Sequence, residues 1–237
     1  MINDFIPLFY GVRLLSLILS LGIAGLVLRK RSDYILNKLI SASFLLFAFG
    51  YTIEAMTFLL GNTIQNNSSY FMAIIVFLVT TAIYLIFLVS YSLMKGEESV
   101  TDIKLLFWTY TPFIALWFLA LATNSFRYKE VTDNANTYWL FEPNPLGTIS
   151  VVLPAFIYLL MALYYLMKLY RVSNIEMKPS IRQFTFGVTF AILFGILIVV
   201  SSNLLSQTDE IQFLNQSLRP LGVAIGGIFI ARSFLKN

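Results

Sequence analysis

The sequence has no cysteine and no histidine among its 237 residues. Without cysteine there is no disulfide bond, no catalytic thiolate and no cysteine-bound metal. Without histidine, Ser-His-Asp catalysis, histidine metal ligands and a phosphoacceptor histidine are excluded. Charged residues are also scarce, at 12% of the chain compared with about 25% in soluble domains. We therefore expect a protein that is not an enzyme, with no cofactor, no metal site and no nucleic-acid partner.

Hydrophobic residues are abundant, at 58% of the chain, and many of them lie in long runs. A helix that crosses a bilayer needs about 20 mostly apolar residues. Seven runs meet this requirement, at residues 5–28, 36–60, 70–94, 104–122, 148–170, 183–205 and 212–234. The sequence therefore predicts an all-α membrane protein, a single domain over residues 1–237 built as a seven-transmembrane helix bundle.

Basic residues are distributed unevenly between the loops. With the N-terminus outside, the inner loops and the C-terminal end hold twelve of the 16 lysines and arginines. The outer loops hold Arg127 and Lys129, and the spans hold Arg13 and Arg219. Because lysine and arginine favour the cytoplasmic side, we expect a multi-pass protein of the cell membrane, with the N-terminus outside and the C-terminus in the cytoplasm.

The longest loop, residues 123–147, connects the fourth and fifth spans on the outer side. Residues 126–131 and 137–141 favour strands, and the sequence DNAN between them favours a turn. We therefore expect an outer β-hairpin between helices 4 and 5. It covers the bundle either as a lid over a ligand or as a simple cap.

Three ionisable residues interrupt the spans, namely Arg13 in the first, Glu54 in the second and Arg219 in the last. Such residues are costly in a bilayer and are functional candidates by default. At a rise of about 1.5 Å per residue, all three lie about 9–12 Å below the outer surface. The first, second and seventh helices are neighbours in an ordinary ring of seven, so we expect these side chains to form a buried cluster.

The charges of this cluster allow two interpretations. Two arginines and one glutamate leave one positive charge unpaired, and arginine binds carboxylate or phosphate in bidentate fashion. The cluster is then an anion-binding site that opens to the outside. In the alternative, one arginine forms a structural ion pair with Glu54, and the other extends towards the outer interface.

Four further polar residues are ligand-binding candidates: Tyr51, Asn215, Tyr84 and Asn203. The first two lie one turn before Glu54 and Arg219, respectively, and so share a helix face with them. Two glycines, Gly222 and Gly226, lie on the same face as Arg219 and allow a helix, a ligand or another protein to approach closely. No lysine occurs between Leu221 and Phe229, so a retinal Schiff base has no attachment point.

The second half of the chain resembles a known family. The segment YWLFEPNPLGTISVVLPAFIYLLMALYYLMKLYR is followed by RQFTFGVTFAILFGILIVVSSNLL and by a last span that ends IFIARSFLKN. This order of spans, with the N-terminus outside, is similar to the seven-helix N-terminal sensor region of prokaryotic histidine kinases, over roughly residues 120–237. The resemblance implies a module that receives a signal outside or within the membrane and passes it to a cytoplasmic output domain.

The chain departs from that family at its C-terminal end. It has no kinase domain, no dimerisation helix and no phosphoacceptor histidine, and it stops at Asn237. Two expectations follow. Either the chain belongs to a longer protein, or it is a relative that signals through another protein.

We therefore expect a receptor-like sensor module in the lipid bilayer that binds a small anionic or lipidic ligand from the outer side. Its partners are a cytoplasmic signalling protein or a second copy of the chain, and its basic inner loops contact that partner or anionic lipids. A small transporter or channel is the alternative, although the spans show no convincing repeat. A structural subunit of a membrane complex is the third. A membrane-embedded enzyme lacks an acid–base pair, since Glu54 is the only deep carboxylate.

Overall fold

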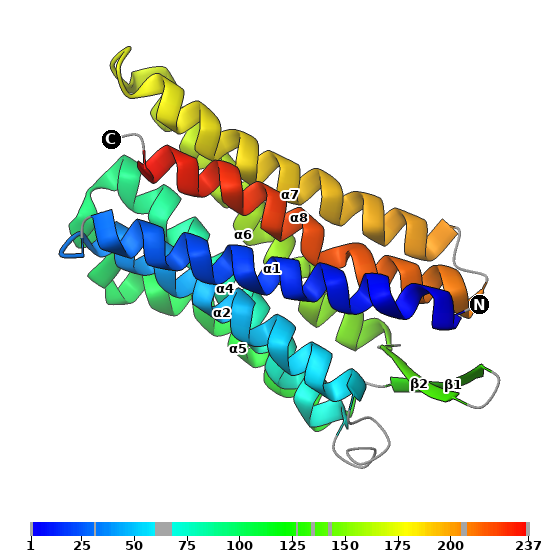
Figure 1. Ribbon diagram of the computed structural model, residues 1–237. Coiled ribbons are helices and arrows are strands. Elements are labelled where there is room, and N and C mark those ends of the chain that lie inside the picture. The colour runs from blue at the N-terminus through cyan, green and yellow to red at the C-terminus, as the bar shows by residue number, and fades with distance from the viewer. Residues whose placement is uncertain are drawn as a thin grey trace.

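The computed structural model describes residues 2–30, 32–59, 68–126, 128–133, 136–141, 144–204 and 208–235. In this part of the chain, long helices form a bundle and two short strands lie at one end of it (Figure 1). The helices are α1 (Ile2–Lys30), α2 (Ile35–Leu59), α4 (Ser68–Lys95), α5 (Ile103–Ala122), α6 (Pro145–Val172), α7 (Lys178–Leu204) and α8 (Asp209–Leu235), with a short 3₁₀ helix η2 (Glu97–Thr101). The strands are β1 (Tyr128–Asp133) and β2 (Asn136–Phe141).

Six helices in the described part of the chain, all of these except α7, are long and apolar enough to cross a membrane. They correspond to six of the seven predicted spans. All the long helices begin one to five residues before the predicted ranges, because a helix continues through the polar interface beyond its apolar core. The protein is thus a bundle of membrane-type helices, and the number of seven spans stays a prediction.

Local sequence signals explain where several helices begin and end. After α4, Gly96 has a φ of 102°, in the left-handed region that glycine adopts without a steric penalty. The Asp102 carboxylate accepts hydrogen bonds from the backbone N–H groups of Lys104 and Leu105 and so caps α5. Asn144 caps α6 in the same way, with Pro145 in the first helical position.

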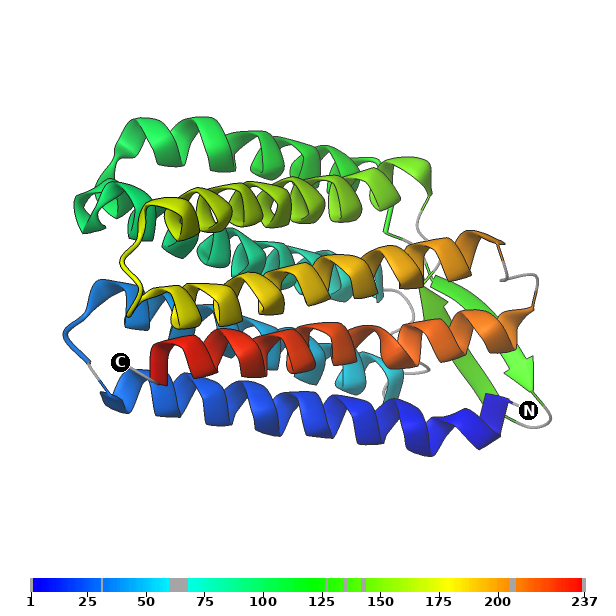
Figure 2. The same ribbon diagram turned by 90° about the horizontal axis from the view of Figure 1, so that it is seen from above.

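The helices form a ring that leaves one of them outside. Helix α1 packs against α2 and α8, α4 packs against α2 and α6, and α7 packs against α6 and α8. Helix α5 packs only at the periphery, against α4 and α6. Figure 2 shows α1 and α5 at opposite edges of the bundle. The N-terminus and the strands lie at one end, which we call the hairpin end, and the C-terminus lies at the other (Figures 1 and 2).

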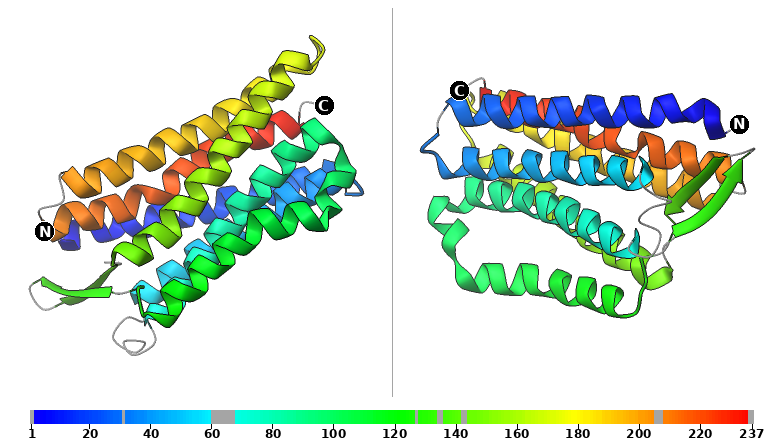
Figure 3. Two further views of the ribbon diagram at one scale, coloured as in Figure 1. Left: turned by 180° about the vertical axis from the view of Figure 1, so that it is seen from behind. Right: turned by 60° about the horizontal axis from the view of Figure 1, so that its bottom comes forward.

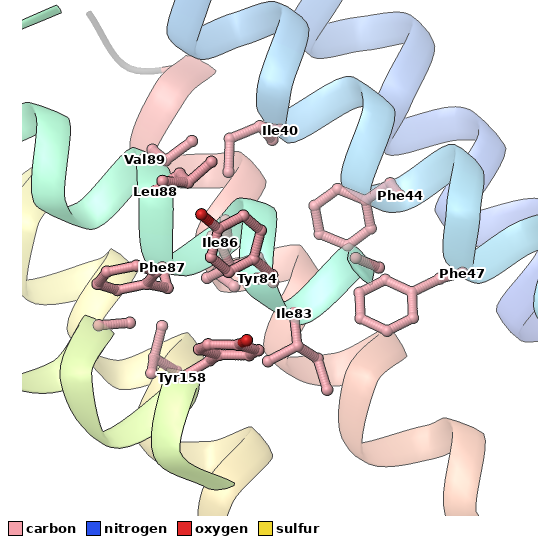
Figure 4. Close-up of a cluster of buried hydrophobic side chains, with 14 of the residues drawn as sticks. Ile40, Phe44, Phe47, Ile83, Tyr84, Ile86, Phe87, Leu88, Val89 and Tyr158 are labelled. Atoms are coloured by element: carbon pink, nitrogen blue, oxygen red, sulfur yellow. The ribbon is translucent and has the colours of Figure 1, made fainter. Parts of the chain in front are cut away.

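The core between α2, α4 and α6 is built from aromatic and aliphatic side chains, including Phe44, Phe47, Phe87 and Tyr158 (Figure 4). Large apolar side chains also cover the outside of the bundle, such as Ile18, which is 58% exposed. In water, so much exposed apolar surface would be unfavourable. The same surface suits contact with lipid acyl chains.

Helix α5 is held by a network of hydroxyl groups. The Tyr84 hydroxyl of α4 forms a 2.9 Å hydrogen bond with Thr109 Oγ1 of α5, and Thr81 Oγ1 lies 2.7 Å from the Tyr110 hydroxyl. From α6, the Tyr158 hydroxyl donates to the backbone carbonyl of Thr109 at 2.7 Å. Hydrogen bonds between helices stabilise membrane bundles, so these side chains position a helix that packs weakly otherwise.

Helices α7 and α8 approach each other through glycines. A Cβ atom added to Gly226 would lie 2.7 Å from the backbone oxygen of Gly187, and one added to Gly187 would lie 2.5 Å from the backbone oxygen of Gly226. A Cβ atom on Gly222 would lie 2.6 Å from the Phe194 ring. The predicted glycine face of the last span is therefore buried against α7, and it is not a free surface for another protein.

The two strands pair in antiparallel fashion, with Tyr128 opposite Phe141 and Asp133 opposite Asn136. They lie at the hairpin end, between the end of α5 and the start of α6 (Figure 1). Residues 134 and 135 of the predicted turn lie outside the described residues. The orientation of this end with respect to the membrane stays a prediction.

Candidate functional site

The three charged residues of the spans come together where α1, α2 and α8 meet. Arg13 Nη2 lies 3.0 Å from Glu54 Oε1, and Arg219 Nη2 lies 2.5 Å from the same oxygen. One carboxylate oxygen therefore binds two guanidinium groups from two different helices. We call Arg13, Glu54 and Arg219 the charged cluster. Its existence agrees with the depths estimated from the sequence.

Arg13 is enclosed by the protein. Its side chain is only 2% exposed. It donates hydrogen bonds to the backbone carbonyls of Phe9, at 3.3 Å, and Gln216, at 3.2 Å. Its guanidinium carbon also lies 3.3 Å from the centre of the Phe9 ring, a close cation–π contact. Arg13 thus joins α1 to both α2 and α8, which is a structural role.

Arg219 occupies a different environment, although it binds the same oxygen. Its side chain is 38% exposed, compared with 4% for Glu54. Its one hydrogen bond in the described structure goes to Glu54. The second carboxylate oxygen, Glu54 Oε2, is buried and has no hydrogen-bond partner among the described residues. The two arginines are therefore not equivalent, and only Arg219 remains accessible to a further anion.

The cluster forms here because burial leaves no alternative to pairing. A charge buried in an apolar environment is very unfavourable unless it is paired and hydrogen-bonded. On α1, the face that carries Arg13 continues with Ser16 and Ser20, both fully buried against the neighbouring helices. Their hydroxyl oxygens have no hydrogen-bond partner in the described part of the chain. The junction of α1, α2 and α8 is thus a polar strip within an apolar bundle.

A cavity of about 430 Å³ lies beside the charged cluster, enclosed by α2, α4, α6, α7 and α8. Glu54 and Arg219 line it, together with the buried Tyr51. Among the described lining side chains, these three are the only ones that carry nitrogen or oxygen atoms. The rest of the wall is apolar, for example Phe47 of α2 and Ile230 of α8. The cavity therefore has one polar end and a long apolar body.

The size and composition of this cavity are typical of a ligand site. Pockets for small ligands usually have volumes of about 300–1,000 Å³ and apolar walls with a few polar groups that orient the ligand. Glycines contribute to its wall on α8, where Gly222 and Gly226 leave space because they have no side chain. The same glycines allow α7 to pack closely, so they shape both the helix contact and the cavity.

The remaining candidates from the sequence separate into three cases. Tyr51 lines the cavity one turn from Glu54. Asn215 is buried, with 8% exposure, one turn before Arg219 on α8, but does not line the cavity. Tyr84 does not line the cavity either, since its hydroxyl is engaged with α5. Asn203 belongs to the last turn of α7, and its side chain lies outside the described ones.

In the described structure the Tyr84 hydroxyl serves the contact between α4 and α5, and its role as a ligand residue stays a prediction. The apolar residues that shape the cavity could not be identified from the sequence. Phe44, Phe194, Gly195 and Val152 come from three different helices and look like any lipid-facing or core residue in the sequence. Only their positions relative to one another distinguish them.

Among the described residues, no group of three acidic side chains lies close enough together to hold a metal ion.

A scan of the sequence against protein-family models and a search among curated proteins found no match. The resemblance to sensor regions of histidine kinases thus stays a prediction from the sequence.

Proposed function

We propose that this chain is a receptor-like sensor module that spans the cell membrane seven times, with its N-terminus and hairpin outside. It binds a small anionic or lipidic ligand in the cavity and signals to a cytoplasmic partner. The observation that carries this proposal is the apolar cavity with Arg219 and Glu54 at one end. In the described part of the chain, ten of the 13 basic residues lie at helix ends opposite the hairpin end, which supports the orientation.

The charges of the cluster explain why the ligand is anionic. Two guanidinium groups face one carboxylate, so the cluster has an excess of one positive charge in an apolar environment. Arg13 is already enclosed by backbone carbonyls and the Phe9 ring, whereas Arg219 lines the cavity. An anion beside Arg219 would neutralise the excess charge, and hydrogen bonds between charged groups are among the strongest available.

The shared oxygen suggests how binding could be transmitted. Arg219 links α8 to α2 only through Glu54 Oε1, and Arg13 binds that same oxygen. A ligand anion competes with Glu54 for Arg219, which weakens the link between α8 and α2 and leaves the link between α1 and α2 in place. Helix α8 continues to the C-terminal end, so a shift of α8 would reach the cytoplasmic side. A ligand shifts an equilibrium only by its difference in affinity for two states.

A panel of ligands tests this proposal through thermal unfolding of the purified protein in detergent. The panel contains small anions, amino acids, nucleotides and lipids. A ligand at about one hundred times its dissociation constant is expected to stabilise the protein by about 2.7 kcal/mol. Arg219→Gln is expected to abolish the stabilisation by anionic ligands, because it removes the unpaired positive charge.

The matched control is Arg232→Gln, which removes an exposed charge from the last turn of the same helix, about 20 Å from Arg219 along the helix axis. This variant is expected to respond to ligands like the wild type. If no compound stabilises the wild type, the binding proposal fails, and a structural role of the cluster takes its place. If a bound compound is carried into proteoliposomes at a rate that depends on Arg219, the protein is a transporter instead of a receptor.

A further inference from the structure

We infer that the ligand is a single-chain anionic amphiphile, which enters the cavity from the bilayer between α6 and α7. Its headgroup lies beside Arg219 and Tyr51, and its chain follows the apolar walls. This inference rests on the proposed function, because it names the ligand class and the entry route for the same cavity.

Polar and apolar surfaces are separated within the cavity. The lining nitrogen and oxygen atoms of the described side chains all belong to Tyr51, Glu54 and Arg219, and thus to one end of the cavity. An amino acid or a nucleotide has polar groups over its whole length. Most of these groups would be buried without hydrogen-bond partners, which is costly. A molecule with one polar end and one apolar chain matches both regions.

The length of the cavity is close to that of one lipid tail. Arg219 and Ile230 of α8 both line it. They are eleven residues apart, which corresponds to about 16 Å along the helix axis. This is about half of the ~30 Å hydrocarbon thickness of a bilayer, and therefore similar to the extent of one lipid tail. The volume of about 430 Å³ is at the low end for ligand pockets, which favours one chain over two.

The polar end of the cavity has the chemistry of an anion site. The charged cluster has one unpaired positive charge, so a headgroup with one negative charge neutralises it. Arg219 is the accessible guanidinium, with a side-chain exposure of 38%. Tyr51, which makes no hydrogen bond within the described part of the chain, adds a hydroxyl donor on the same side of the cavity. Both groups donate hydrogen bonds, as a carboxylate headgroup requires.

The entry route follows from the wall formed by α6 and α7. Two lining residues are themselves exposed, namely Val152 of α6, at 37%, and Gly195 of α7. A Cβ atom added to Gly195 would meet nothing within 4 Å. Figure 3 shows that α6 and α7 lie close together at the loop that joins them and diverge from each other towards the hairpin end. The cavity therefore opens sideways to the lipid, where an amphiphile is already concentrated.

Photolabelling of the full chain tests the ligand class. The protein is placed in nanodiscs of phosphatidylcholine with palmitic acid that carries a diazirine near its methyl end. Labelled peptides are expected from the apolar walls, around Ile86 of α4 and Leu159 of α6. Unlabelled palmitate is expected to compete with the label. Hexadecanol, which has the same chain length and no charge, is expected to compete with an affinity at least about tenfold lower. Arg219→Gln lowers the affinity for palmitate to a similar extent.

A second pair of variants tests the entry route. Gly195→Trp places a large ring in the opening without an initial clash, and we expect it to slow the initial rate of labelling severalfold. Gly22→Trp is the matched control, since Gly22 is exposed on α1 and its added side chain also meets open space. The control variant is expected to be labelled at the rate of the wild type.

The outcomes separate the inference from the proposed function. If small soluble anions stabilise the protein but palmitate neither labels the cavity nor competes, the ligand is not an amphiphile, and the proposed function stands without this inference. If hexadecanol competes as well as palmitate, the headgroup is not recognised and the inference is overturned. Equal labelling rates for Gly195→Trp and Gly22→Trp would exclude entry between α6 and α7. If nothing binds in either experiment, both proposals fail.

Discussion

Glu54→Gln is expected to lower the free energy of unfolding by about 3–5 kcal/mol, the usual effect of removing one partner from a buried ion pair. The substitution keeps the shape of the side chain but leaves two guanidinium groups close together without a counter-charge. Arg13 cannot move to solvent, since its side chain is 2% exposed and held between α1, α2 and α8. Denaturant titration in detergent micelles measures the effect.

A triple substitution provides the control. When Arg13, Glu54 and Arg219 are replaced together by Met, Leu and Met, no charge remains in the cluster. Replacing a complete buried ion network by apolar residues is often neutral or stabilising, so most of the stability is expected to return. Glu54→Gln with the stability of the wild type would falsify the buried cluster itself. A triple variant as unstable as the single one would show that packing, and not charge, is responsible.

Gly226→Ala is expected to destabilise the protein by about 3 kcal/mol, a large effect for overpacking by one methyl group. The new methyl group would lie 2.7 Å from the backbone oxygen of Gly187. A backbone oxygen cannot rotate away as a flexible side chain can, so α7 and α8 have to separate along their contact. Because both helices line the cavity, ligand-dependent stabilisation is also expected to weaken. Thermal unfolding with and without ligand measures both effects.

Gly25→Ala is the matched control for this substitution. Gly25 is an exposed glycine of α1, and an added Cβ atom there meets nothing within 4 Å. Alanine has the higher helix propensity, so this variant is expected to be as stable as the wild type or slightly more stable. If both alanine variants unfold at the same temperature, the glycine contact between α7 and α8 does not have the importance that we assign to it.

The charged cluster is a feature of this membrane protein that could be predicted from the sequence. Arg13, Glu54 and Arg219 were expected to meet from their similar depths and from the adjacency of the first, second and last helices in a ring, and their distances of 3.0 and 2.5 Å agree. The expectation succeeds because a bilayer strongly disfavours unpaired charge and because the rise per residue of a helix is fixed. Depth is therefore a local property that the sequence contains, and the need for a partner follows from the bilayer.

Other features of the site could not be obtained in this way. Both arginines have the same residue type and similar depth, yet only Arg219 lines the cavity. This difference depends on the Phe9 ring and the Gln216 carbonyl, which enclose Arg13. Tyr84 looked like a cavity residue in the sequence, but the position of α5 beside α4 engages its hydroxyl instead. Such differences depend on which helices are neighbours, and hydrophobic periodicity does not specify this.

The sequence by itself determined the class of the protein, because long apolar runs and scarce charge decide between water and lipid as the surrounding medium. It also determined which charged residues, namely Arg13, Glu54 and Arg219, need a partner of opposite charge when they are buried. Only the tertiary structure decided that a cavity exists beside them. Glycines bring α7 and α8 together at Gly187 and Gly226, while α6 and α7 separate towards the hairpin end. A cavity results from the relative positions of five helices, each of which has an ordinary apolar sequence.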